Sequence, residues 1–554
     1  MYACYRLRGL GLGVQVFEAG SDVGGTWYWN RYPGARYDVP SLNYCYSIPQ
    51  IYDTWNWTER YAAQPEIEKY ARFVADELNL RPSITFDTRV NSTIYDETAG
   101  RWLVETSSGE RVSARWLVMA TGGYSAPLKP NIVGLDSFKG ELYYTAKWPG
   151  EDISYKGKRI GVIGTGSSGM QVTTQLGTED EFDHLYVFQR TANFAVPAVN
   201  HPLDPEYQAE FKKTYADYWA QARQSGSGTV RQVRSTTVAD MTDSEFEAYM
   251  AEAWRIGGPQ ILNGIVDLMV SEAANARVSE YLRRKLRERI DDPALADLLS
   301  AKGLFLGARR MLNEDGYFEV FNNPRVELVD VRSDPIIQLA EYGVMTQSGR
   351  LYELDMLILA TGFDSGTGAL MRIDIRGRDG LEFHEKWAAG PVTFLGACVS
   401  GFPNMFIIAG PGSPSIRSNE LVSIEQHVDW IAELLARSIN DQVDTVEAEA
   451  SAEERWTDHV AAIANSTLLV RDDTQYVGAN VPGKPRVFLA YAGGVSLFRW
   501  ISEAVRDSDY EGCDSDYEGL SLLRGAVRVN AGDREWSGPP RDPKLETRFG
   551  ASVI

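Results

Sequence analysis

Cysteine is scarce in this sequence, and no two cysteines have the spacing of a redox or metal site. The 554 residues include four, Cys4, Cys45, Cys398 and Cys513, which are scattered along the chain without a C-x-x-C motif. This usage argues against a disulfide framework and is typical of reduced thiols in the cytosol. We therefore expect a cytoplasmic protein without a metal centre.

Long apolar runs are also missing, and basic residues are outnumbered. No run approaches the roughly 20 apolar residues that cross a bilayer, and no signal peptide is visible. Lys and Arg number 55 against 76 Asp and Glu, which gives a net charge of −21. Such a charge argues against nucleic acid and anionic membranes as partners. We expect a globular protein of two or three domains that acts on a small molecule as a monomer or weak oligomer.

A dinucleotide-binding turn lies near residue 164. Arg159–Ile163 is an apolar strand, and the residues after it are Gly164, Thr165, Gly166, Ser167, Ser168 and Gly169, in a G-x-G-x-x-G pattern. A helix beginning with Met170 and Gln171 follows. A bare match is often an ordinary turn, but a strand on one side and a helix on the other favour a pyrophosphate site. The helix N-terminus would face the phosphates with its partial positive charge.

The next strand indicates which nucleotide binds at this turn. His184–Phe188 is followed by Gln189, Arg190 and Thr191, where a site for NAD would have an acid for the ribose hydroxyl. Arg190 instead suits a 2′-phosphate, so the sequence predicts NADPH. The alternative is a solvated arginine at a strand end.

A second nucleotide site is predicted near the N-terminus. A helix over Met1–Leu12 and a strand over Val14–Phe17 lead to Glu18, an acid placed to bind an adenosine ribose. The strand and glycine turn that normally precede such a helix are not in the sequence. We expect an incomplete N-terminus rather than a lost cofactor site. Gly24 and Gly25 then introduce a glycine and aromatic loop that would suit a flavin.

The segment before the glycine turn carries a family resemblance. Phe138, Gly140, Tyr144, Trp148 and Pro149 match the type I Baeyer–Villiger monooxygenase fingerprint F-x-G-x-x-x-H-x-x-x-W-P, except that Tyr144 replaces the histidine. The chain resembles this family of class B flavoprotein monooxygenases over about residues 1–512, most nearly phenylacetone monooxygenase.

The resemblance implies an α/β fold with two Rossmann-type domains and a helical subdomain. The FAD domain would comprise residues 1–137 and 365–512, and the NADP domain 138–203 and 301–364. The helical subdomain would comprise residues 204–300. Residues 513–554 resemble nothing in the family and are predicted to be a disordered tail.

The resemblance also implies residues for both cofactors. For FAD these are Glu18, Gly24, Gly25, Thr26, Trp27, Tyr28, Trp29, Asp38, Tyr44, Val90 and Glu420. For NADPH they are Arg36, Tyr37, Asp38, the 164–171 segment, Arg190, Thr191, Arg309, Arg310 and Gln475. Gln475 stands where the family has a tryptophan that contacts NADP.

The implied reaction is oxygen insertion beside a ketone carbonyl through a C4a-peroxyflavin formed from O₂. Arg310 would supply a fixed positive charge to the peroxyanion, and Asp38 would orient Arg310. Ser415, Ile416 and Arg417 would form a substrate loop. Arg417 and Glu420 are polar where close relatives are apolar, which indicates a pocket more polar than one for phenylacetone. The alternatives are oxidation of nitrogen or sulfur by a related flavin monooxygenase, and an inactive truncated homologue.

Overall fold

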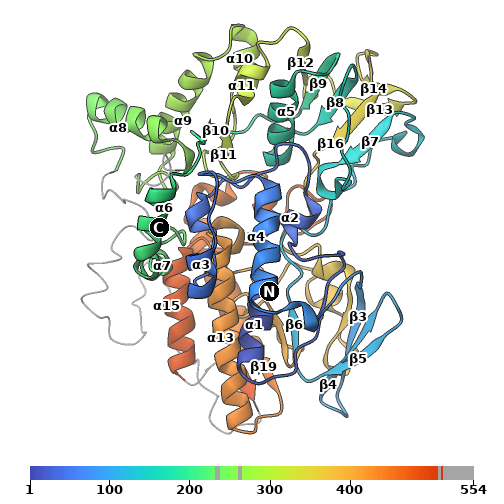
Figure 1. The fold of residues 1–554 in the computed structure, drawn as a ribbon, viewed down its shortest axis with the longest axis vertical. Coiled ribbons are helices and arrows are strands. Elements are labelled where there is room, and N and C mark those ends of the chain that lie inside the picture. The colour runs from blue at the N-terminus through green and yellow to red at the C-terminus, as the bar shows by residue number, and fades with distance from the viewer. Residues whose placement is uncertain (231–236, 260–264, 509–512, 516–554) are drawn as a thin grey trace.

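A computed structural model describes residues 1–230, 237–259, 265–508 and 513–515. Its largest sheet has five parallel strands in the order β12-β9-β8-β16-β7. These are β7 (Glu141–Tyr144), β8 (Arg159–Ile163), β9 (His184–Gln189), β12 (Val326–Asp330) and β16 (Met356–Leu359). Figure 1 shows this sheet and helix α5 (Ser167–Glu179) at one end of the molecule. The sheet confirms a Rossmann-type fold at the predicted glycine turn, and its strands come from two separate stretches of sequence.

The turn between β8 and α5 depends on close backbone approach. Gly164 has φ +110, and a Cβ built on it would lie 2.4 Å from the oxygen of Ala360, which follows β16. A Cβ on Gly169 would lie 1.9 Å from the oxygen of Gly164. A Cβ on Gly166 would meet nothing within 4 Å. Two of the three glycines are therefore required by packing, while Gly166 leaves open space at the start of the helix.

The other part of the chain combines small sheets with long helices. β1 (Val16–Phe17) pairs with β2 (Ile84–Thr85), and β6 (Leu117–Met119) with β18 (Met405–Ile407), both in parallel. A four-stranded sheet has the order β17-β3-β4-β5, with strands Asp374–Arg376, Val90–Asp96, Arg101–Thr106 and Arg111–Ala114. The helices are α1 (Tyr2–Gly9), α2 (Thr26–Trp29), α3 (Pro49–Thr54), α4 (Gln64–Glu77), α12 (Phe383–Lys386), α13 (Glu420–Asn440), α14 (Ala450–Asn465) and α15 (Gly494–Asp507). Figure 1 shows α13 and α15 side by side.

Two sequence predictions need correction here. The sequence predicts one strand over Ile84–Ile94, but β2 and β3 belong to different sheets because Asp87, at φ 51, turns the chain between them. The spacing of apolar residues predicts a helix over Ser418–Ala436, and the structure has it as α13, Glu420–Asn440. It begins later because the Asn419 side chain accepts a hydrogen bond from the Leu421 N–H (3.3 Å) and caps the helix.

Helices occupy most of the interval between β9 and β12. They are α6 (Pro205–Lys213), α7 (Tyr215–Arg223), α8 (Asp243–Ile256), α9 (Glu272–Arg287), α10 (Pro293–Leu299) and the short α11 (Tyr317–Val320). β10 (Ala195–Pro197) and β11 (Leu312–Glu314) pair in parallel across this insertion. The basic run of α9 faces acids: Arg287 pairs with Glu280 at 2.8 Å and Arg284 with Glu247 at 2.5 Å. Because acids are mixed with the arginines in the sequence, the run is predicted to be a solvated helix face, and these exposed ion pairs agree with that prediction.

The remaining strands lie at two edges. β13 (Ile336–Ala340), β14 (Gly343–Thr346) and β15 (Leu351–Glu353) form an antiparallel sheet. β19 (Val446–Ala448) pairs antiparallel with β20 (Cys513–Ser515). The first residues of the segment predicted to be disordered therefore form a strand, because β19 offers an edge to pair with. The rest of that segment lies outside the described residues. No helix in the described ranges is long and apolar enough to cross a bilayer.

Substitutions in the glycine turn separate packing from cofactor approach. We expect Gly169→Ala to lower the free energy of unfolding by several kcal/mol, at or above the usual ~1–3 kcal/mol for overpacking, because its Cβ would meet backbone. Gly166→Ala, at a site with open space, is expected to change it by less than about 1 kcal/mol. Chemical denaturation monitored by circular dichroism measures both values. Equal destabilisation by the two variants would contradict this account of the turn.

Candidate active site

An ion pair joins two segments that are 272 residues apart in the sequence. The Arg310 Nε donates to Asp38 Oδ2 at 2.5 Å, and Arg310 Nη2 donates to Asp38 Oδ1, so the contact is bidentate. Asn313 Nδ2 also donates to the backbone oxygen of Asp38, at 3.1 Å. Asp38 lies in the loop after α2 and Arg310 immediately before β11. The structure thus brings the two predicted catalytic residues together.

The pair fixes the charge of the arginine. The neighbouring Asp38 carboxylate is the largest influence on Arg310 and raises its pKa above the ordinary value, against the opposing effect of burial. The Arg310 side chain remains 36% accessible and that of Asp38 15%. Arg310 is therefore a permanently protonated group that is held in one orientation and still has surface available to a ligand.

The predicted substrate loop lies against this arginine. Ser415–Arg417 forms the 3-10 turn η8, and Arg310 Nη1 donates to the Ile416 oxygen at 3.2 Å. Ser415 has φ 25, which is unusual for a residue other than glycine and marks a strained loop. Ile416 packs with Tyr476 and Tyr124 in one apolar cluster. These contacts give the space beside Arg310 an apolar and aromatic wall.

Glu420 adds an acid to the site. It is the first residue of α13, and burial raises its pKa to about 7, with nearby Arg310 acting in the opposite direction. Burial raises the pKa of the Tyr44 hydroxyl to about 12, and the nearby charge of Glu420 acts in the same direction. Glu420 therefore changes its protonation state near neutral pH beside a fixed positive charge.

The residues predicted for the flavin gather around α2. Trp27 Nε1 donates to the Tyr44 hydroxyl at 3.1 Å, and the rings of Tyr44 and Tyr37 stack with centroids 5.0 Å apart. Trp27, Tyr28 and Trp29 make up α2 with Thr26, yet none of the four is buried. Gly25, with φ 52, has open space at its Cβ position. A helix of partly accessible aromatic rings beside an open glycine fits a flat ring system such as that of FAD.

The predicted ribose-binding acid lies beside that helix. The Glu18 side chain accepts from the Gly20 N–H at 2.7 Å, and a Cβ on Gly20 would meet the ring of Tyr28. The backbone oxygen of Glu18 accepts from the Thr88 N–H, two residues before Val90. Glu18 and Val90 thus lie on the same side of the molecule as α2. The segment 24–29, expected as a loop, is a glycine turn followed by a short helix.

The glycine turn and two arginines are the residues predicted for NADPH. The Thr165 hydroxyl donates to the Thr191 oxygen at 3.2 Å, which brings the turn to the end of β9. Arg190, exposed at that strand end, lies close enough to Arg309 for its charge to lower the pKa of Arg309, although burial is the larger cause. The Arg309 Nε is buried without a hydrogen-bond partner. Two adjacent guanidinium groups, one with an unsatisfied donor, fit the 2′-phosphate of NADP.

Gln475 is close to Arg309 in the structure, but the residue that contacts Arg309 is Asp473, two positions before Gln475. It opens the 3-10 turn η10 (Gln475–Val477), and Arg309 Nη2 approaches the oxygen of Asp473 at 3.5 Å. The structure places Gln475 beside this cofactor site without a direct contact to the arginine.

The loop between α2 and Asp38 connects the two sites. The Gln171 side chain donates to the Arg36 oxygen at 2.8 Å and accepts from the Tyr32 hydroxyl at 2.7 Å. A Cβ on Gly34 would lie 2.6 Å from the Gln171 oxygen. Arg36 itself pairs with Glu59 at 3.4 Å, and Tyr37 is buried. The loop that carries Asp38 is therefore held against the first turns of α5.

The fingerprint segment is structural. Gly140 has Phe138 and the backbone oxygen of Asp355 within 2.7 Å of its Cβ position, so a side chain has no room there. Tyr144 ends the edge strand β7, and buried Trp148 packs on Tyr143 with centroids 5.2 Å apart. The segment thus fixes an edge of the parallel sheet, and none of its side chains contacts Asp38 or Arg310.

Sequence reasoning missed Asn313, Tyr124 and the role of the Tyr476 ring in this site. Asn313 follows Arg310 by three residues, so its proximity was available from spacing. Tyr124 follows the Ala120-Thr121-Gly122 strand end, where a chain crosses between nucleotide domains, and that position was the only signal for it.

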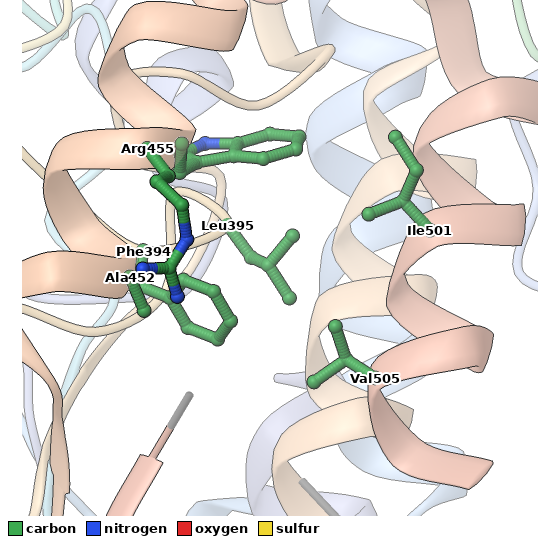
Figure 2. A pocket seen from close by; sticks show the side chains of 7 residues that line it. Phe394, Leu395, Ala452, Arg455, Ile501 and Val505 are labelled. Carbon is green, nitrogen blue, oxygen red and sulfur yellow. The ribbon is translucent and has the colours of Figure 1, made fainter. Parts of the chain in front are cut away.

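Two features of the described residues lie apart from this site. Figure 2 shows a small apolar crevice between α14 and α15, lined by Phe394, Leu395, Ala452, Arg455, Trp456, Ile501 and Val505, none of which is a predicted site residue. Cys4, Cys45 and Cys398 are buried. No group of three or more His, Cys, Asp or Glu in the described ranges is arranged to hold a metal ion.

Comparisons with known proteins agree with the fold. Residues 34–254 match the family model of pyridine nucleotide-disulphide oxidoreductases. The chain is 38% identical to a cyclohexanone 1,2-monooxygenase from Acinetobacter sp., over 96% of each chain. It is 37% identical to the phenazine N-monooxygenase PhzNO1 from Lysobacter antibioticus, over 92% of this chain and 94% of the relative. It superposes on the OTEMO complex with FAD and NADP with a TM-score of 0.89 at 34% identity, covering 93% and 97% of the two chains.

The two nucleotide sites and the parallel sheet define a pyridine-nucleotide-dependent flavoprotein oxidoreductase. Within that class, the chain belongs to the Baeyer–Villiger monooxygenase family. FAD and NADP(H) are its cofactors. The fingerprint resemblance is thereby confirmed, while the nearest likeness to phenylacetone monooxygenase and the missing N-terminal glycine turn stay predictions.

Removing Asp38 tests the ion pair. We expect Asp38→Ala to lower the free energy of unfolding by about 2 kcal/mol, because it leaves a partly buried guanidinium unpaired. The control, Asp374→Ala, removes an exposed partner of Arg376 and should change it by less than about 1 kcal/mol. Urea unfolding of both variants makes the comparison, and equal losses would contradict a structural role for the pair.

Glu420 gives a pH-dependent contribution to stability. Its pKa is raised from 4.5 to about 7 in the folded protein, so the folded state binds its proton more tightly than the unfolded state. This contribution is fully present below pH 4.5 and is lost as the pH rises through 7. In Glu420→Gln the loss, at most ~3 kcal/mol, should disappear, whereas exposed Glu385→Gln should follow the wild type. Parallel curves of unfolding free energy against pH for all three proteins would refute the assignment.

Proposed function

We propose that this enzyme inserts one oxygen atom of O₂ beside the carbonyl carbon of a ketone at Arg310. The balanced reaction is ketone, O₂, NADPH and a proton giving ester or lactone, NADP⁺ and water. FAD, when bound, supplies the reduction of O₂ and the transfer of one oxygen atom. The observation that carries the proposal is the protonated Arg310, bidentate to Asp38 and still accessible, between the residues for the two cofactors.

The protein's own residues contribute charge, orientation and exclusion of water. Arg310 stabilises negative charge that develops on oxygen during the reaction, because its guanidinium is fixed in place before the substrate arrives. Asp38 holds two of its donors, so the third nitrogen, which also contacts Ile416, is directed away from the carboxylate. The wall of Ile416, Tyr124 and Tyr476 limits water near that charge and strengthens its field.

Several residues support the assignment of the cofactors. The partly accessible rings on α2, with Tyr44 and Glu18, support FAD on one side of Asp38. The open Gly166 and the pair Arg190 and Arg309 support NADPH on the other. Asp38 lies in the loop held to α5 by Gln171, between these groups.

Oxidation of a nitrogen heteroatom is the second candidate. A relative that is 37% identical is named as an N-monooxygenase, so the fold and identity alone do not select the ketone. Purified enzyme with NADPH should be supplied separately with cyclohexanone and with phenazine, and the products analysed by mass spectrometry. Lactone formation supports the ketone reaction, and N-oxide formation without lactone would replace it.

Arg310 and Arg309 have separable roles in this proposal. We expect Arg310→Met to lower the rate of ketone oxygenation by about 10²–10³-fold, as for loss of one donor to a developing oxyanion. Its anaerobic reduction of flavin by NADPH should persist, and Arg310→Lys should lose less oxygenation. Arg309→Met should raise the KM for NADPH while each turnover still yields the same product. Stopped-flow spectra and product yield measure these effects, and unchanged oxygenation in Arg310→Met would refute the proposal.

A further inference from the structure

Arg417 brings a second guanidinium group to the site. It ends η8, the turn whose Ile416 oxygen accepts from Arg310, and its charge and that of Arg310 affect each other. The Arg417 guanidinium lies over the ring of Tyr476 at 5.3 Å from the centroid. Its Nη1 donates to the Gly307 oxygen at 3.3 Å. These two contacts fix the position of the group at the wall of the site.

The arginine has no carboxylate partner among the described residues. Its neighbour Arg310 uses Nε and Nη2 to bind Asp38, whereas the same edge of Arg417 makes no hydrogen bond with any residue that the structure describes. Burial and the like charge of Arg310 lower the pKa of Arg417, but an arginine in a protein stays protonated. An unpaired, partly buried cation has a cost in stability that a bound anion would offset.

The free edge has the geometry that suits a carboxylate. Nε and Nη2 of a guanidinium present two parallel donors that match the two oxygens of a carboxylate, as Arg310 and Asp38 show in the same site. The groups that suit the phosphates of NADPH are elsewhere, at the Gly164–Gly169 turn and at Arg190 and Arg309. Of the arginines named at the site, Arg417 is therefore the one available to bind a charged group of the substrate.

We propose that the ketone oxidised at this site carries a carboxylate, and that Arg417 binds it. The inference rests on the proposed ketone oxidation, because it names the substrate class of the same site. Arg417 anchors the charged end of the substrate, and its shared wall with Arg310 through Ile416 places the carbonyl end beside Arg310.

Matched ketones test the proposal in the wild-type holoenzyme. The probes are 5-oxohexanoate, its methyl ester and cyclohexanone, each with saturating NADPH. A hydrogen-bonded charge pair contributes about 1.5–3 kcal/mol, so kcat/KM for the acid should exceed that for the ester by about 10-fold or more. Equal values for acid and ester, with both oxygenated, would overturn the inference and leave the ketone reaction intact. If none of the three ketones is oxygenated while NADPH reduces the flavin, both proposals fail.

Variants then locate the preference. Arg417→Leu should abolish the advantage of the acid by raising its KM, with little change for the ester, and Arg417→Lys should restore part of it. Arg332→Leu, at an exposed position two residues after β12, serves as the matched control and should keep the preference. A rise in the KM for NADPH in Arg417→Leu, with the acid still preferred, would assign Arg417 to the cofactor and overturn the inference. The flavin spectrum of each variant verifies that it has folded.

Discussion

The bidentate contact between Asp38 and Arg310 is the interaction on which the site depends. It joins the loop after α2 to the segment before β11, and these belong to parts of the chain that are predicted to build different nucleotide sites. A guanidinium buried in part of its surface is tolerated because a carboxylate faces it in the right geometry. The same carboxylate fixes which nitrogen atoms remain for a substrate. In the proposed reaction, stability and chemistry therefore rely on the same contact, and a change of either residue would affect both.

Backbone contacts keep that pair in register. Gly34 approaches the Gln171 oxygen so closely that a side chain would not fit, and Gln171 holds the Arg36 oxygen two residues before Asp38. On the other side, Asn313 holds the Asp38 oxygen three residues after Arg310. Through these short links, the positions of Asp38 and Arg310 relative to each other are set by contacts between neighbouring loops. A catalytic pair built from distant segments needs this kind of support, because a displacement of about 1 Å can cost a large part of the rate.

Sequence patterns predicted the parts of the fold that local chemistry determines. The strand Arg159–Ile163 was placed with its observed bounds, since a run of apolar residues ending in a glycine turn has few other structures. The resemblance located Asp38 and Arg310 as partners. It did not locate the break at Asp87 or the cap at Asn419, because each depends on a single backbone conformation or hydrogen bond. Tyr124 was missed for a different reason: tertiary packing against Ile416 and Tyr476 brings it to the site, and no periodicity records that contact.

The charged groups of the site neutralise one another only in part. Asp38 neutralises Arg310, and Arg309 and Arg190 repel each other where the 2′-phosphate of NADP fits. Glu420, with a pKa of about 7, is close to Arg310 and not among the groups that influence Arg417. Its partial ionisation therefore adjusts the field at Arg310 without cancelling the charge of Arg417. In a relative with apolar side chains at positions 417 and 420, only Asp38 and Arg310 would be charged here, and their charges would neutralise each other. Here Arg417 adds a positive charge at the wall of the site, and the proposed substrate carboxylate would neutralise it.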